Sequence, residues 1–136
     1  DPQAEAQREL TLHGRPVQAW RRAGEVVWFS FATLCEGPRS QNDYIELAED
    51  FHTLLLSGVP VFESALQDDA ARRFIALVDE LYDQGVKLIV SAAAAPDALY
   101  RADRLRDSFQ RTASRLTEMQ SEAYLARPHG RSVAGA

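Results

Sequence analysis

The chain has 136 residues, 46% of them hydrophobic and 26% charged, which is typical of a soluble globular domain. Its net charge of −5 argues against nucleic acid as the main partner, and no apolar run approaches the roughly 20 residues that span a bilayer. The chain begins with Asp1 and its only methionine is Met119, so we expect it to be a piece of a longer polypeptide. Cys35 stands alone, which excludes an internal disulfide, fits a reducing compartment and predicts a cytoplasmic location.

The N-terminal third of the sequence is predicted to be β-structure. Residues 1–8 show little apolar periodicity and are expected to be a linker. Short strands are predicted at residues 9–12, 17–22 and 26–30, with tight turns at His13-Gly14 and around Gly24. Three short strands joined by tight turns indicate an antiparallel meander.

The remaining sequence alternates between strands and helices. After a helical turn at residues 31–35, Ser40 and Asp43 form a weak capping box, so a helix should begin near Gln41. Further helices are predicted from residue 68 to 83, with Gly85 as its C-terminal cap, and from residue 104 to 119. Continuous apolar runs at residues 53–56 and 86–91 predict strands that are buried on both faces.

This order of elements predicts an α/β fold. Strands that alternate with helices pair in parallel and are connected by crossover helices. We therefore expect a short antiparallel β-meander followed by alternating strands and helices that resemble the second half of a P-loop NTPase core. The predicted boundaries are a linker at 1–8, a single α/β domain at 9–126 and a flexible tail at 127–136.

Several kinds of catalytic site are absent from the sequence. The only lysine, Lys87, lies in a predicted strand without flanking glycines, so no Walker A phosphate loop is present. The histidines at positions 13, 52 and 129 are far apart and Cys35 has no cysteine partner, which predicts no metal site. The sequence shows no pairing of a nucleophile with a base, so a small independent hydrolase is not indicated.

The segment from residue 72 to 115 is more informative. It resembles part of an AAA+ core, in which a polar residue at a strand end senses the γ-phosphate and a later helix supplies arginines to the nucleotide. Here the strand ends in Ser91, and the later helix carries Arg111 and Arg115. An arginine can neutralise charge on a transferring phosphoryl group. The alternative is that both arginines form surface ion pairs with neighbours on the same helix.

Other candidate residues have equally open interpretations. Arg39 is a candidate nucleotide contact next to the capping residue Ser40, or it simply remains in solvent. Ser91 is either sensor-like or a strand-end hydroxyl bonded to backbone. The pair Asp79-Glu80 resembles a Walker B pair by its letters but lies in a predicted helix, whereas the strand at 53–56 ends in Ser57-Gly58 without the expected acids. The aromatic residues Trp20, Trp28 and Phe29 are expected in the core; if exposed together, they would mark a surface normally covered by the rest of the protein.

Several long motifs occur together in this chain. They are residues 35–44 (CEGPRSQNDY), 51–53 with Val59-Pro60, 71–82 (ARRFIALVDELY), 86–92 (VKLIVSA) and 109–121 (FQRTASRLTEMQS). In this order, over about residues 10–129, they resemble the C-terminal region of the ZapE-type (Afg-like) cell-division ATPases.

The resemblance implies functions that the composition and spacing do not. The family is a P-loop ATPase that uses ATP and Mg²⁺ in the full-length protein, and its implied partner is the tubulin-like protein FtsZ. Its Walker motifs lie upstream of the matched region, so we expect the N-terminal ATPase half to be missing here and this part alone to need no cofactor. The alternative is a non-catalytic module that binds a protein partner.

Overall fold

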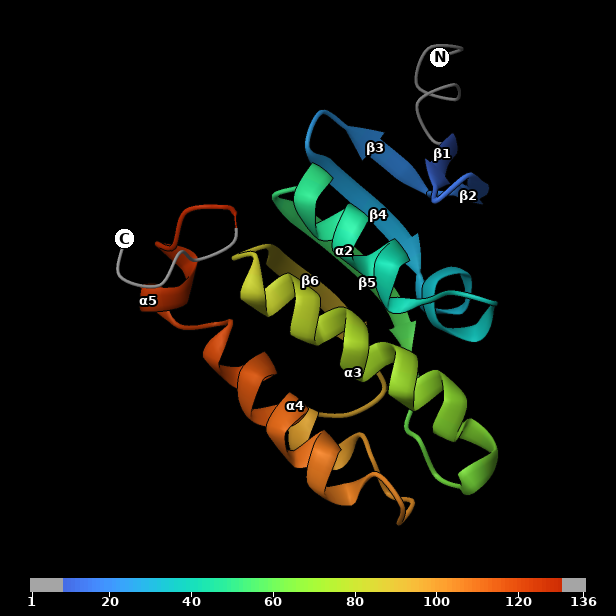
Figure 1. The fold of residues 1–136 in the computed structure, drawn as a ribbon. Coiled ribbons are helices and arrows are strands. Elements are labelled where there is room, and N and C mark those ends of the chain that lie inside the picture. Colours follow the sequence, from blue (N-terminus) through green and yellow to red (C-terminus); the bar gives the residue numbers. More distant parts are fainter. Residues whose placement is uncertain (1–8, 131–136) are drawn as a thin grey trace.

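The structure is a computed structural model that describes residues 9–130. The predicted linker, residues 1–8, and residues 131–136 of the predicted tail lie outside the described residues. Within the described part, the strands form a two-stranded sheet and a four-stranded sheet, and helices pack beside the larger sheet (Figure 1). The fold is therefore mixed α/β, as the alternating pattern predicts.

The N-terminal strands form two separate hairpins. β1 (Glu9–Leu12) pairs with β2 (Arg15–Gln18), and β3 (Arg21–Ala23) pairs with β4 (Val26–Ser30), both antiparallel. The prediction of one continuous meander is therefore wrong. The chain leaves the first hairpin at Ala19, which is fully buried, and the Trp20 amide then donates a 2.7 Å hydrogen bond to the Trp28 carbonyl. The chain therefore changes direction between the two hairpins at a buried residue.

The four-stranded sheet has the order β3-β4-β5-β6. β5 (Thr53–Val59) pairs in parallel with β4 on one side and with β6 (Lys87–Ala92) on the other. One row of neighbouring residues crosses β4, β5 and β6, because Trp28 is the register partner of Leu55 and Leu55 is the register partner of Ile89. The predicted parallel β-α-β arrangement is present in this part of the chain.

Two crossover helices cover one face of this sheet (Figure 1). α2 (Gln41–Asp50) connects β4 to β5, and α3 (Asp68–Asp83) connects β5 to β6. α4 (Arg106–Glu118) runs beside α3, and the short α5 (Glu122–Leu125) follows it. Short helical turns lie in the connections: the π-helical η1 (Ala32–Glu36), and the 3-10 turns η2 (Ala65–Gln67) and η3 (Pro96–Ala98).

The hydrophobic core lies between the sheet and these helices. Each parallel strand turns alternate side chains toward the helices, and those of Phe29, Leu54 and Leu56 are completely buried. The α2 side chains of Tyr44, Leu47 and Ala48 are buried in the same core, and Phe29 is a core residue as expected. A cluster of aromatic rings closes the end of the core near α4; its members are Phe31, Phe62, Phe74, Tyr100 and Phe109.

Among residues 9–130, the other face of the sheet is open, which corrects the prediction of strands buried on both faces. In β5 the burial alternates, with Leu55 only partly buried between two buried leucines. In β6, Ile89 is 58% exposed. The physical reason is topological: both crossovers advance in the same direction along the sheet, so their right-handed connections place both helices on the same face.

The described start of the predicted tail packs against the domain. The Gly130 amide donates to the Gln84 carbonyl at 2.6 Å, and a ring nitrogen of His129 lies 2.6 Å from the Ala48 carbonyl oxygen. The Lys87 ammonium donates to the Arg127 carbonyl at 2.8 Å. Residues 127–130 thus contact the ends of α2 and α3, and the boundary at residue 126 remains a prediction.

Candidate functional site

A row of serines marks the carboxyl edge of the parallel strands, where open α/β sheets generally bind their ligands. β4 ends at Ser30, whose register partner on β5 is Ser57. The Ser57 hydroxyl accepts a 2.6 Å hydrogen bond from the Trp28 indole N–H. The hydroxyl of Ser91 near the end of β6 accepts a 3.1 Å hydrogen bond from the Gly58 amide. This edge therefore presents small polar groups that a ligand could contact.

Ser91 itself is exposed and has a backbone partner. Its bond to Gly58 crosses the point where the β5–β6 register shifts, between Leu56 and Val59. The hydroxyl thus helps to hold an irregular strand end, and its exposed position also leaves it accessible from solvent.

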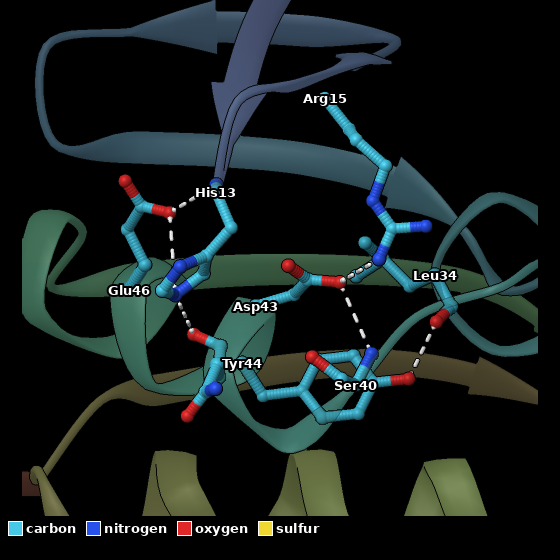
Figure 2. A network of polar contacts seen from close by, with 8 residues as sticks. His13, Arg15, Leu34, Ser40, Asp43, Tyr44 and Glu46 are labelled. Atoms are coloured by element: carbon cyan, nitrogen blue, oxygen red, sulfur yellow. Dashed lines mark hydrogen bonds and ion pairs between the residues drawn. The ribbon is translucent and has the colours of Figure 1, made fainter.

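The N-terminus of α2 meets the first hairpin at the same edge, in a polar network (Figure 2). Asp43 is completely buried, and its Oδ2 accepts a 3.0 Å hydrogen bond from the Ser40 amide. The Arg15 guanidinium lies 4.0 Å from the same oxygen. Glu46 accepts a hydrogen bond from the backbone amide of His13 at 2.9 Å. The network fastens the β1–β2 turn, where His13 has a φ of +49°, onto α2.

The segment before α2 is held by buried groups. The Tyr44 hydroxyl donates a 2.6 Å hydrogen bond to the Leu34 carbonyl of η1, and Arg73 from α3 donates to the Cys35 carbonyl at 3.3 Å. Burial raises the pKa of the Cys35 thiol to about 12, and it also raises the pKa of Tyr44. Cys35 therefore keeps its proton at neutral pH, which argues against a role as a thiolate nucleophile.

Arg39 lies between η1 and α2. Its side chain is partly buried, and its Nε has no hydrogen-bond partner among the described residues. The alternative that Arg39 simply remains in solvent does not hold for its Nε, which is buried. A buried donor without an acceptor is unfavourable, so this arginine has an unused hydrogen-bonding group at the carboxyl edge.

Arg115 is engaged within the chain. It forms an ion pair and hydrogen bond with Asp79 of α3, and its guanidinium lies 4.9 Å from the centre of the Tyr82 ring. The two charged side chains are 28% and 29% exposed. Asp79 therefore belongs to an ion pair on a helix, and it is not the acid of a Walker B strand.

Arg111 lies about one turn earlier on α4 and is exposed. Within residues 9–130 no hydrogen bond or ion pair engages its guanidinium. The structure therefore separates the two arginines, since Arg115 is held against α3 and Arg111 extends into solvent.

The four predicted site residues do not gather at one place. Ser91 and Arg39 lie at the carboxyl edge of the sheet, whereas Arg111 lies near the middle of α4 and Arg115 near its C-terminal end, toward the opposite edge of the sheet (Figure 1). The carboxyl edge also contains Ser30 and Ser57, which the sequence analysis did not propose as site residues. The repeated pattern of a serine after an apolar strand, at Ser30, Ser57 and Ser91, was a signal that could have found them.

No group of three or more histidine, cysteine, aspartate or glutamate side chains in residues 9–130 could hold a metal ion. In the same range, no helix is long and apolar enough to cross a membrane.

Comparison with known proteins establishes the family. The family described as "AFG1-like ATPase" matches residues 1–128. The chain belongs to the AFG1-like ATPase family. The Escherichia coli K12 protein named "Cell division protein ZapE" is 49% identical over 120 residues, which cover 88% of this chain and 32% of that protein. The resemblance stated from the motifs is therefore confirmed.

More distant relatives occur in eukaryotes. "Lactation elevated protein 1 homolog B" of Danio rerio is 34% identical over 149 residues, covering 86% of this chain and 29% of that protein. An uncharacterized Schizosaccharomyces pombe protein is 36% identical over 94 residues, covering 69% of this chain and 20% of that protein. No solved structure matches the chain. The chain thus spans about a third of the length of the first two AFG1-like relatives.

Proposed function

We propose that this chain is the C-terminal part of a ZapE-like P-loop ATPase. The full-length protein would bind ATP and Mg²⁺ and hydrolyse ATP in the cytoplasm. Its Walker A and Walker B residues would lie upstream, because the only lysine here, Lys87, is on β6 without a glycine loop. The α/β unit described above would form the second half of the ATPase core. The family match over residues 1–128 and the coverage of only 32% of the Escherichia coli relative support this assignment.

The open face of the parallel sheet is the observation that carries the proposal. Parallel sheets are almost always covered on both faces. Here the uncovered face presents Trp28, Leu55 and Ile89 as one row, and Trp20, which is 46% exposed, packs edge-on against Trp28. An apolar row of this kind fits a surface that the rest of an ATPase body covers.

Within that ATPase, Arg111 and Arg115 are the candidate arginines for the nucleotide of the same or a neighbouring subunit. Arg111 is the better placed of the two, since its guanidinium is free to approach a phosphate. Arg115 would first have to leave Asp79 and Tyr82. Ser91 and Arg39 are proposed nucleotide contacts at the carboxyl edge.

The second candidate function is a non-catalytic module that binds a protein partner, for which the same exposed apolar face is suited. The name of the Escherichia coli relative supports a role in cell division, and FtsZ is the partner implied by the resemblance. In this alternative the chain would act without nucleotide.

ATP hydrolysis by the full-length protein distinguishes these functions. We expect steady turnover by the full-length protein with Mg²⁺, and none by the 136-residue chain alone. In the full-length protein, Arg111→Ala should reduce kcat at least tenfold, with the exposed α4 residue Ser114→Ala as the matched control. A full-length protein that hydrolyses no ATP would overturn the ATPase proposal and favour the interaction module.

A further inference from the structure

The two edges of the four-stranded sheet differ sharply. The β3 edge has three residues, two of which are Arg21 and Arg22, and short charged strands are the usual protection against unwanted pairing. The β6 edge has six residues, and residues 88–92 carry neither a charge nor a proline. In the described chain, therefore, the β3 edge is short and charged, whereas the longer β6 edge carries a charge only at its first residue, Lys87.

The outward backbone groups of β6 can be assigned from its hydrogen bonds to β5. The Lys87 amide donates to the His52 carbonyl, and the Ala93 amide donates to the Val59 carbonyl, on the β5 side. Because successive amides of a strand point in opposite directions, the amides of Leu88, Val90 and Ala92 point away from β5. They form a row of donors along the free edge.

An apolar groove runs beside this free edge. It has a volume of about 250 Å³ and lies between β6, the η3 connection and α4. Leu88, Val90 and Ala92 line it from the strand, and Leu116 of α4 and the C-cap residue Met119 line it from the other side. α4 thus lies beyond β6, and the space next to the strand edge is lined by apolar side chains.

We propose that the β6 edge and this groove receive a β-strand from the part of the full-length protein that lies outside these 136 residues. The strand would pair with the outward amides and carbonyls of β6 and place alternate apolar side chains in the groove, as in other cases of strand addition. This inference rests on the proposed function, in which the chain is part of a larger ATPase body.

Two observations favour a strand of the same polypeptide over a peptide from another protein. An unprotected edge is a site of aggregation whenever it is uncovered, so it suits a permanent occupant better than a transient one. The Escherichia coli relative is about three times as long as the matched region, which leaves ample chain to supply a strand. A covalently connected strand also binds at a high effective concentration.

Residue-resolved amide hydrogen exchange tests the proposal in the full-length protein and in the 136-residue chain. The amides of Leu88, Val90 and Ala92 should exchange rapidly in the 136-residue chain. In the full-length protein they should exchange more slowly by on the order of 100-fold. The amides of Ile89 and Ser91, which face β5, are the internal control and should be slow in both.

Each alternative result has a distinct meaning. Rapid exchange at residues 88, 90 and 92 in the full-length protein would overturn the proposal, even if that protein hydrolyses ATP. Slow exchange in the 136-residue chain that disappears on dilution would assign the edge to a second copy. Protection in the full-length protein that appears only after another protein is added would assign it to a peptide of that protein. Assignment of the edge to a second copy or to a peptide of another protein would also refute the inference. None of the three results depends on whether the full-length protein hydrolyses ATP.

A charge in the groove gives a second test. Val90→Glu places a carboxylate on the groove side of β6, where Val90 is only partly buried in the 136-residue chain but would be completely buried in the full-length protein. The variant should lower the melting temperature of the full-length protein clearly more than that of the chain. Equal decreases in both would contradict a seated strand.

Discussion

The contact between Arg115 and Asp79 should stabilise the fold by a measurable amount. Both side chains are less than a third exposed, and the arginine also covers the Tyr82 ring. Ion pairs at such positions contribute about 0.5–1 kcal/mol, and a cation–π contact contributes about as much again. We therefore expect Arg115→Ala to lower the free energy of unfolding by about 1–2 kcal/mol.

Urea denaturation of the 136-residue chain measures this effect. With the slope of roughly 2 kcal/mol per molar urea expected for a small protein, the midpoint should fall by about 0.5–1 M. A double-mutant cycle with Asp79→Ala isolates the pair and should give a coupling of about 0.5–1 kcal/mol. Arg111→Ala, on the exposed side of the same helix, is the control and should change stability by less than about 0.5 kcal/mol.

The reasoning would be refuted if the coupling between Arg115 and Asp79 were close to zero. Arg115 would then not be held by α3, and it would be as available to a nucleotide as Arg111. A full coupling combined with unchanged ATP hydrolysis of Arg115→Ala in the full-length protein would assign Arg115 a purely structural role.

Three further predictions concern the fold. Gly85→Ala should be more destabilising than Gly24→Ala. Both glycines have positive φ, which costs an alanine roughly 1–2 kcal/mol, but only at Gly85 would the new Cβ lie 2.6 Å from a backbone oxygen, that of Pro128. Equal losses of stability in urea denaturation would contradict this close approach. Asp43→Ala should cost about 1–2 kcal/mol because it removes the acceptor of the Ser40 amide, whereas Asn42→Ala should change little; a neutral Asp43→Ala would show that the buried carboxylate contributes nothing. The free energy of unfolding should fall as pH rises from about 9 toward 12, because folded Cys35 keeps its proton, at a pKa of about 12, while the unfolded thiol loses it near 9.0. Unfolding followed by circular dichroism at several pH values should show a smaller decrease in Cys35→Ala than in the unsubstituted chain. An identical decrease in both would refute the assignment to Cys35.

Local patterns in the sequence predicted the elements of the parallel unit well. The helix expected to begin near Gln41 is α2 (Gln41–Asp50), and the helix expected at 68–83 is α3 (Asp68–Asp83). Both follow from apolar spacing and capping residues, which act within a few positions of the chain. The strands β5 and β6 were predicted from continuous apolar runs.

The burial of those strands could not be predicted, because an apolar run does not reveal which face a helix covers. Leu55 and Ile89 are open because of the direction of two crossovers, which is a property of the whole sheet. The N-terminal strands likewise separate into two hairpins at Ala19, whose complete burial is a property of the folded chain that the local pattern does not reveal.

The prediction of the candidate site from the sequence was limited because its residues have partners far away in the chain. The partner of Arg115 is 36 positions away, whereas sequence reasoning considered neighbours one helical turn apart. Asp43 was predicted as a capping residue, but its complete burial beneath the β1–β2 hairpin depends on Arg15 and the turn at His13. The serines at the carboxyl edge were visible in the sequence, but only the parallel register of β4 and β5 makes Ser30 and Ser57 partners.

Calorimetric titration with ATP and Mg²⁺, on the 136-residue chain and on the full-length protein in parallel, tests the central claim most directly. The proposed function predicts binding by the full-length protein and no detectable binding by the chain alone. Binding of ATP by the 136-residue chain at micromolar affinity would contradict the proposal that its phosphate site lies upstream, and would assign a self-contained nucleotide site to the carboxyl edge around Ser91 and Arg39.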